Sequence, residues 1–479
     1  MNLVVVLLLP LLASAFSRFS SGKKVAPAVT VLSCGFLLVI GIADSIAVVA
    51  GRVIPGVEGW VALDGLSALM FLAVSWSSLI ASIFSVGYID HHYGQDARRM
   101  RSYYGHFNLF VFALVAVPLI AEPNLDWIAV EFTALFAVLL VGFENTHEAL
   151  EAAWKYIVLM FMGAAIALLG FLILYWALER AGGGIYTWQG LRAMGKTLPP
   201  DLVRTAFLLI LVGFGTKTGL VPMHTWLPDA HSQAPSPVCT LLSGVKTTVC
   251  MYPILRLLPL LPPASGERWF LIFGFLSVGV AAFLLLQVHD YKRMFAFSTV
   301  EHMGIIFSAV GFGVPAARYA AMAQILTHSM TKSFCFLVAG AMVMVLKTRD
   351  ISSVRGFVKI SPFISAALFI GSFAIAGAPP FAVFISEFSI FKAGYNSHQY
   401  LLTSLLVFFI VVAFYGLIYQ VSRMAFGTPS EEPKNSHLPA TCRISLVLGA
   451  IPVVVLGFYW PEMLKQLLQL AATGLEVIR

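Results

Sequence analysis

The stretch GFGTKTGLVPMHTWLPDAHSQAPSPV, residues 213–238, interrupts one of the long apolar segments of this chain with a lysine and several prolines. Proline removes a helical hydrogen bond and clashes with the preceding turn, so Pro222 and Pro228 predict a broken helix. The carbonyl groups freed by such a break inside a bilayer survive only where protein or water satisfies them. A charge at bilayer depth costs at least about 2.5 kcal/mol, so Lys217 in this position indicates function.

The composition excludes a soluble globular protein. Of 479 residues, 59% are hydrophobic and only 11% are charged, against about 25% charged residues in soluble domains. A membrane-spanning helix needs about 20 mainly apolar residues, and the chain divides into about fourteen such runs. They are 2–17, 28–51, 66–89, 105–121, 123–143, 152–178, 203–229, 237–261, 268–288, 294–315, 317–346, 360–394, 400–427 and 441–465.

The sequence therefore predicts an all-α polytopic membrane protein. The first run resembles a signal peptide, but its positive charges follow the apolar stretch, which favours an uncleaved span. Lysine and arginine concentrate in the loops after odd-numbered spans, so we expect those loops to be cytoplasmic. With fourteen spans, both termini are then expected on the non-cytoplasmic side of the cytoplasmic (inner) membrane. The net charge of +7 is accounted for in this way and does not indicate nucleic acid as a partner.

A second break is predicted in FAIAGAPPFAVFISEF, residues 373–388, at Pro379 and Pro380. It follows Pro222 by about 157 residues, or roughly five spans, which suggests two inverted five-helix repeats with one broken helix each. A single proline more often produces a simple kink, but a Gly-Ala-Pro-Pro run favours a break in the helix. The predicted division is residues 1–104 (spans 1–3), 105–262 (first repeat), 263–428 (second repeat) and 429–479 (span 14).

Ionisable residues recur deep inside these spans. The first repeat contains Glu131, Lys217 and Lys246, and the second contains Gln324, His328 and Lys332 at i, i+4 and i+8, followed by Glu387. We expect a proton relay of Glu131, Lys217, Lys246, His328, Lys332 and Glu387, with support from His224, His231, His302 and Gln324. At an effective dielectric near 20, moving a Glu–Lys pair from about 4 to about 8 Å changes its attraction by about 2 kcal/mol. Small helix movements would thus load or release a proton.

Purely structural roles for some of these residues compete with the relay interpretation. A lysine near a span end usually snorkels to the interface, and a lone histidine such as His302 is as often structural. Charges at loop boundaries are expected to be solvated or packing groups; these are Asp64, Glu144, Glu148, Glu151, Lys155, Asp290 and Arg349. The five cysteines are scattered without C-x-x-C spacing, so no metal or iron–sulfur site and no catalytic site is expected on this chain.

Several motifs resemble the antiporter-like proton-conducting subunits of respiratory complex I and its relatives. The likeness lies in residues 215–238 and in YKRMFAFSTVEHMG (291–304), LTHSMTKSFCFL (326–337), GAPPFAVFISEF (377–388), LDGLSALMF (63–71) and EAAWKY (151–156). The closest likeness is to the F subunit of hydrogenase-4 and formate-hydrogenlyase-type complexes. The resemblance implies fourteen helices with broken helices seven and twelve. It also implies an essential Glu131–Lys217 pair, Lys246 as the eighth-helix lysine, His328 and Lys332 as a central pair, and Glu387 at the exit.

The resemblance implies a proton-translocating subunit of an energy-converting oxidoreductase complex. Other membrane subunits and redox subunits would be its partners, and iron–sulfur clusters and a Ni-Fe centre would lie in those partners. Two alternatives stay open: a subunit of an Mrp-type Na⁺(K⁺)/H⁺ antiporter complex, and a membrane partner in inorganic-carbon uptake. A purely structural anchor is hard to reconcile with so many buried ionisable residues.

Overall fold

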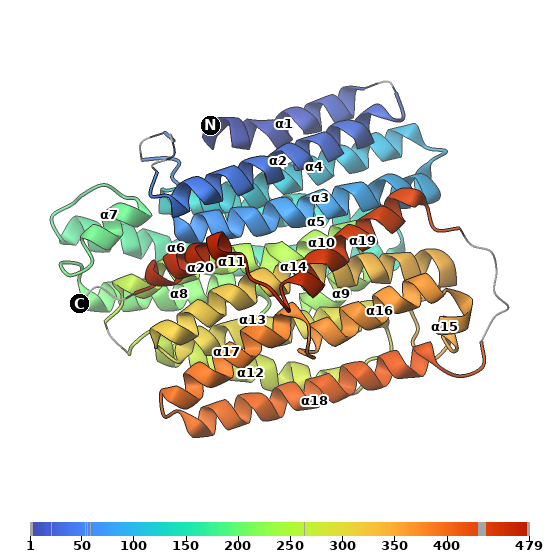
Figure 1. Ribbon diagram of the computed structural model, residues 1–479. Helices are drawn as coiled ribbons and strands as arrows, with labels where there is room; N and C mark the ends of the chain where they lie inside the picture. Colours follow the sequence, from blue (N-terminus) through green and yellow to red (C-terminus); the bar gives the residue numbers. More distant parts are fainter. Residues whose placement is uncertain are drawn as a thin grey trace.

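The chain folds into a bundle of long helices that run side by side (Figure 1). The computed structural model describes residues 3–20, 22–52, 54, 56–57, 59–262, 264–429 and 437–476. Within these residues, β-structure is confined to two isolated bridges, Val61–Ile120 and Asp290–Asp350. Residue 2, where the first predicted span begins, and residue 263, where the second predicted repeat begins, lie outside the described residues.

The first half of the bundle runs from α1 to η3 and includes the first helix break. Its elements are α1 (Leu3–Phe19), α2 (Val25–Val49), α3 (Gly65–Tyr93), α4 (Ala97–Leu119), α5 (Pro123–Val141) with the short η1 (Gly142–Glu144), α6 (His147–Arg180), α7 (Trp188–Ala193), α8 (Pro200–Thr218), α9 (Trp226–Gln233), α10 (Ser236–Leu241), the π-helical turn η2 (Leu242–Lys246), α11 (Thr247–Leu257) and η3 (Leu258–Leu260).

The second half begins with the α12–α13 hairpin and ends with two short helices. These elements are α12 (Glu267–Leu285), α13 (Tyr291–Gly311), α14 (Pro315–Leu346), α15 (Phe357–Ile360), α16 (Pro362–Ile375), α17 (Ala382–Asn396), α18 (Tyr400–Ala425), α19 (Ala440–Val455) and α20 (Glu462–Thr473).

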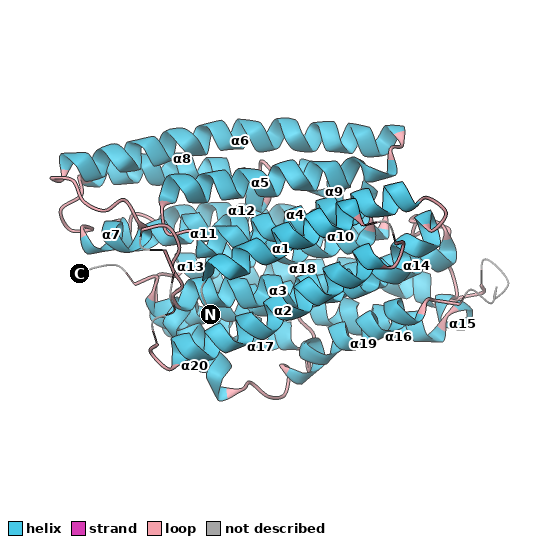
Figure 2. Ribbon diagram, turned by 90° about the horizontal axis from the view of Figure 1, so that it is seen from above, coloured by secondary structure: helices cyan, strands magenta, loops and turns pink. Residues whose placement is uncertain are grey.

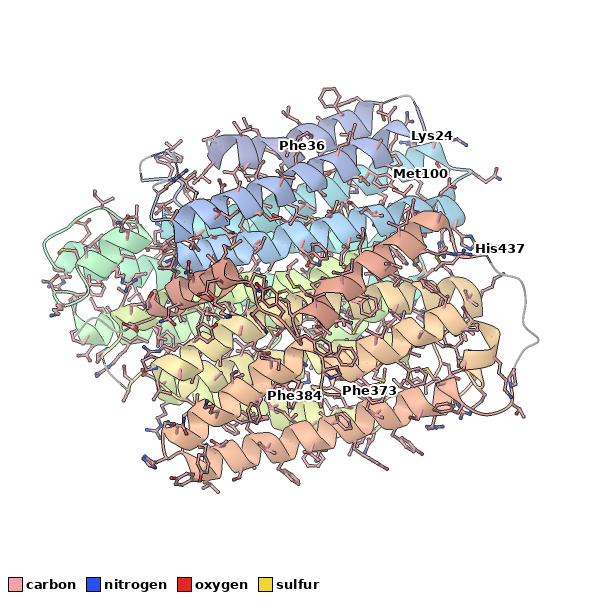
Figure 3. The ribbon with its side chains drawn as sticks, in the orientation of Figure 1. Lys24, Phe36, Met100, Phe373, Phe384 and His437 are labelled. Carbon is pink, nitrogen blue, oxygen red and sulfur yellow. The ribbon has the colours of Figure 1, made fainter. Side chains whose placement is uncertain are left out.

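Ten helical stretches of the described chain are long and apolar enough to cross a membrane, and α1, α16 and α19 are shorter apolar helices. The chain is therefore an all-α, polytopic membrane protein. The count of fourteen spans and the inverted repeats stay predictions. The described ends of the chain lie at one end of the bundle (Figure 1), whereas Lys24, Met100 and His437 mark the opposite end (Figure 3).

Local sequence explains where the helices begin. Asp64 caps α3 by accepting a hydrogen bond from the Ser67 N–H, and Glu122 and Asp290 cap α5 and α13 in the same way. Helices then approach closely through small residues: a Cβ on Gly213 of α8 would overlap the carbonyl oxygen of Gly163 on α6.

Burial separates a central from a peripheral set of helices. In the most apolar 18 residues of Ser236–Leu260 every residue is buried, whereas in the corresponding part of α18 only 33% of the residues are buried. Viewed from above, α10, α13, α14 and α3 lie in the interior, and α6 lies along one edge (Figure 2). Lys246, His302, His328 and Lys332 lie on these interior elements, so their side chains are shielded from lipid by other helices.

Both predicted breaks are present. Residues 219–225 separate α8 from α9, and residues 376–381 separate α16 from α17, with Pro222, Pro379 and Pro380 inside the gaps. Phe373 and Phe384, on the two sides of the second gap, lie near the middle of the bundle's length (Figure 3). The run 441–465, predicted as one span, is corrected by the structure, because residues 456–461 separate α19 from α20.

Candidate ion-translocation site

The first element of the site is a buried ion pair between α5 and α8. The Lys217 Nζ lies 2.9 Å from Oε1 of Glu131, with the lysine side chain fully buried and the glutamate 15% exposed. Apart from this contact, neither group has a hydrogen-bond partner among the described residues. Lys217 lies in the last turn of α8, where the unsatisfied carbonyl groups of a helix end favour a cation. The helix break thus supplies part of the electrostatic environment of the pair.

The break also frees backbone carbonyls that other side chains use. In a continuous helix, the Lys217 carbonyl would accept from the N–H of Val221, but that N–H donates to Ser277 Oγ at 3.0 Å. The Lys217 carbonyl instead accepts from the Nζ of Lys246 at 3.1 Å. The Thr216 carbonyl accepts from Nε1 of Trp226 at 2.8 Å. The orphan carbonyls of a mid-membrane break are therefore satisfied within the protein.

Lys246 is held by aromatic rings as well as by that carbonyl. Its Nζ lies 4.2 Å from the ring centroid of Trp226 and 5.2 Å from that of Tyr156, both within cation–π range. The residue ends the π-helical turn η2, and it is completely buried. The first half of the site thus joins Glu131, Lys217 and Lys246 in one contact chain, of which the second link passes through a backbone carbonyl.

The turn η2 connects this group to the second half of the site. In η2, the Ser243 carbonyl accepts from Nε2 of His328 at 3.2 Å, and the Ser243 hydroxyl lies 2.6 Å from Oγ1 of Thr299. Single π-turns inside α-helices occur frequently at functional sites because they redirect backbone groups. Ser243 precedes Lys246 on the same turn, so His328 contacts the short backbone segment that carries Lys246.

His328 continues to His302 and Gln324. The His302 and His328 ring centroids lie 5.2 Å apart. Gln324 Nε2 lies 3.1 Å from Nδ1 of His302, and His302 Nε2 lies 2.9 Å from the carbonyl oxygen of Ile375, the last residue of α16. Because an amide nitrogen only donates, Nδ1 accepts and the His302 proton resides on Nε2. The second helix break therefore supplies the carbonyl that fixes this tautomer.

Glu387 completes the second half. Its Oε1 accepts from Gln324 Nε2 at 3.4 Å, and Ser386 Oγ donates to the Oε1 of Gln324. A Cβ on Gly377 would overlap Oε2 of Glu387, so the carboxylate packs directly on the backbone of the break. Both the nitrogen and the oxygen of the Gln324 amide are bonded, which makes this side chain the bridge between His302 and Glu387.

Lys332 lies on the predicted face of α14 but contacts α13. Its Nζ donates to the Phe295 carbonyl at 2.7 Å and to Ser298 Oγ. The Phe295 carbonyl also accepts from Thr299 Oγ1 at 3.1 Å, and Thr299 contacts Ser243. Lys332 is thus a branch joined through hydroxyl groups and a carbonyl rather than a direct neighbour of His328.

Two other predicted supporting residues, His224 and His231, have no hydrogen bond to this chain of contacts among the described residues. His231 is buried and its Nδ1 bonds the Leu227 carbonyl at 2.7 Å, between the rings of Trp226 and Phe336. His224 lies partly exposed in the first break, near the exposed Pro222. His302 and Gln324, in contrast, lie inside the network.

Sequence reasoning missed several residues of the site. The contact chain uses Ser243, Thr299 and Trp226. Two further carboxyl groups are buried: Glu301, 5% exposed on α13, and Asp126, fully buried on α5 with Trp188 Nε1 donating to it at 3.2 Å. The two acids carry a sequence signal, since both fall in apolar runs. No group of three or more His, Cys, Asp or Glu residues that would hold a metal occurs among the described residues.

Broken helices around a chain of buried ionisable groups define an ion-transport membrane protein. The family to which this chain belongs is the NADH:quinone oxidoreductase/Mrp antiporter transmembrane family, whose profile matches residues 125–413. The matched range contains every predicted relay residue. Membership therefore rests on the same segment that holds the site.

Two relatives and one solved structure illustrate the likeness. The chain is 34% identical over 403 residues to a hydrogenase-4 component F homolog of Methylacidiphilum infernorum, covering 81% of this chain and 84% of the relative. It is 26% identical to the Na(+)/H(+) antiporter subunit A1 of Staphylococcus haemolyticus, covering 99% of this chain and 62% of the relative. In fold it is similar to a chain of the archaeal membrane-bound sulfane sulfur reductase, with a TM-score of 0.87, 24% identity and coverage of 99% and 97%.

Proposed function

We propose that the chain is the proton-translocating membrane subunit of an energy-converting oxidoreductase complex of the hydrogenase-4 or complex I type. The observation that carries the proposal is the buried Glu131–Lys217 pair with Lys246 bound to the Lys217 carbonyl. Glu131, at 2.9 Å, stabilises a proton on Lys217. Because this attraction weakens as the two groups separate, a small helix movement is enough to release the proton. The likeness to a hydrogenase-4 component supports a redox-linked complex.

In this proposal, protons pass between the Glu131–Lys217 pair and Glu387 through Lys246, η2, His328, His302 and Gln324, with Lys332 as a charged branch. Ordered water would join groups that do not touch. Electron transfer takes place in partner subunits, and those subunits hold the iron–sulfur clusters and the Ni-Fe centre. The complex lies in the cytoplasmic (inner) membrane with both termini of this chain on the non-cytoplasmic side.

Partner identity tests the proposal. The tagged chain is extracted from its native membranes in mild detergent, purified, and its companions are identified by mass spectrometry, with iron and nickel measured in the same sample. Co-purifying iron–sulfur and nickel–iron subunits support the redox-driven pump. Small hydrophobic subunits without any metalloprotein contradict it.

The second candidate function is a subunit of an Mrp-type Na⁺(K⁺)/H⁺ antiporter complex. It is favoured by the similarity to an Na(+)/H(+) antiporter subunit, which extends over 99% of this chain. Such a complex exchanges cations for protons in vesicles without any electron donor. Exchange that proceeds at full rate in the absence of redox substrates would replace the first proposal with this one.

A further inference from the structure

The contact chain that leads to Glu387 contains a side chain that cannot carry a proton. Gln324 joins His302 to Glu387 through its amide nitrogen. An amide neither binds nor releases a proton near neutral pH, so Gln324 holds its two neighbours in place without passing a proton between them. A proton that reaches this point needs water or another titratable group to carry it to Glu387.

Glu301 is a buried acid at this point that the relay described above does not use. It directly precedes His302 on α13 and is 5% exposed. A carboxylate in the interior of a membrane-spanning bundle is costly unless an opposite charge or a proton balances it. The charged neighbours of Glu301 therefore decide its role.

One of these neighbours is Lys332 of α14. The Lys332 ammonium donates to the hydroxyl of Ser298, which lies three residues before Glu301 on the same face of α13. The ammonium and the Glu301 carboxylate lie in electrostatic range of each other. Because the hydrogen bonds of Lys332 go to a hydroxyl and a carbonyl, Glu301 supplies the negative charge that these groups lack.

The second neighbour is Glu387 of α17. Phe312 lies eleven residues, or about three turns, beyond Glu301, so both project from the same face of α13. The Phe312 ring packs on α17, since a Cβ on Gly394 would lie 3.1 Å from it. Glu387 precedes Gly394 by about two turns of α17 and lies in electrostatic range of Glu301. Glu301 is therefore a neighbour of both Lys332 and Glu387.

The charges of these three groups balance only if a proton is shared. Lys332 contributes one positive charge, and two ionised carboxylates would leave one buried negative charge without compensation. The group is neutral when one of the two acids holds a proton, and repulsion between the carboxylates favours the same state. That proton has two places to reside, Glu301 and Glu387.

We propose that Glu301 is a proton-carrying residue of the relay and connects Lys332 to Glu387, past the amide of Gln324. This inference rests on the function proposed above and adds a residue to that site. After Glu387 has lost its proton, the Lys332 ammonium gives a proton to the Glu301 carboxylate. The resulting carboxyl group passes it to the Glu387 carboxylate, and the neutral amine of Lys332 takes up the next proton from the relay, so protons and charge balance.

Substitutions matched in volume separate a proton carrier from a packing residue. Glu301→Gln keeps the volume of the side chain but cannot carry a proton, whereas Glu301→Asp is shorter but can. Proton translocation per electron is measured in sealed inverted vesicles that contain the full complex, with electron transfer as the check of assembly. We expect at least a tenfold loss in Glu301→Gln and a smaller loss in Glu301→Asp. Glu462→Gln, on α20 with its side chain 70% exposed, is the control and should translocate normally.

A packing role predicts the reverse order, with Glu301→Gln normal and the shorter Glu301→Asp impaired. That result, or equal translocation by the two variants, overturns the proposal. If Glu301→Gln does not assemble, Glu301→Asp and Glu301→Asn form a second pair of equal volume, of which only Glu301→Asp should translocate protons. Lys217→Ala is measured in the same vesicles: loss of translocation there, with normal translocation by Glu301→Gln, would reject this inference and leave the proposed function standing.

Discussion

The ammonium of Lys246 lies 3.1 Å from the carbonyl oxygen of Lys217 and joins the π-turn η2 to the end of α8. This contact exists because α8 stops at Thr218, which leaves the Lys217 carbonyl without its helical partner. The position of the Lys246 ammonium therefore depends on the position of the Lys217 backbone. The same break that interrupts the span creates the link between the two charges.

Replacing Lys246 tests that link. Lys246→Met keeps much of the length of the side chain but removes the ammonium from the Lys217 carbonyl and from the Trp226 and Tyr156 rings. We expect proton uptake by inverted vesicles to fall at least tenfold while electron transfer continues. Lys392→Met, at an exposed lysine of α17, is the matched control and should pump normally. Equal pumping by both variants would remove Lys246 from the relay.

The coupling between Glu131 and Lys217 is measurable as stability. Breaking a buried ion pair from one side leaves an unpaired charge and costs about 3–5 kcal/mol, whereas removing both charges costs less. Glu131→Gln and Lys217→Met should therefore each lower the Tm of the purified complex more than the double variant does. A thermal-unfolding cycle of the four proteins gives the coupling energy. Strictly additive effects would show that the two groups do not interact.

The indole of Trp226 is predicted to stabilise the first break. Trp226→Phe keeps an aromatic ring near Lys246 but removes the N–H that donates to the Thr216 carbonyl at 2.8 Å. The Thr216 carbonyl still accepts from the N–H of Gly219 at 3.2 Å, so the variant loses one of two hydrogen bonds, about 1 kcal/mol, and the Tm should fall slightly. Trp269→Phe, at a partly exposed position of α12, serves as the control and should leave the Tm unchanged. Identical Tm values for both variants would contradict the assigned role.

Gln324 is predicted to act as a positioning residue between His302 and Glu387. Gln324→Leu fills a similar volume but removes the bonds to His302, Glu387 and Ser386. We expect proton translocation to fall at least tenfold and its pH profile to shift, since Glu387 and His302 then lose a shared partner. Gln324→Glu keeps the acceptor for Ser386 but replaces the donating amide nitrogen with an oxygen that faces Oε1 of Glu387, so it should be impaired as well. Gln466→Leu, on the exposed side of α20, is the control, and an unshifted profile in Gln324→Leu would count against the bridge.

The sequence located the two functional breaks because proline inside an apolar run has a direct steric meaning. It also placed Glu131 and Lys217 in one relay because charges at that depth are costly, and the resemblance to a known family implied that the two residues pair. The third break escaped it: residues 456–461 are mainly apolar and aromatic, so hydropathy continues through them while Gly457 and Pro461 mark the ends of the helices. The π-turn at Ser243 carries no sequence signal.

Lys332 shows a different limit. Its spacing from His328 places both on one face of α14, but which neighbour each side chain meets is decided by packing between helices. Lys332 meets Phe295 and Ser298 of α13, whereas His328 meets Ser243. Residues spaced four apart on a helix lie on the same face, but this spacing does not determine which neighbouring helix each side chain contacts. The order of the relay therefore became visible only in three dimensions.

The most direct test of the central claim is proton translocation per electron in sealed inverted vesicles that contain the complex with Lys217→Ala. Lys392→Ala in the same vesicles controls for loss of a lysine, and electron transfer is recorded in parallel. The account predicts that Lys217→Ala assembles and transfers electrons but translocates no protons, whereas Lys392→Ala does both. Unimpaired proton translocation by Lys217→Ala would contradict the proposal that the Glu131–Lys217 pair carries the proton.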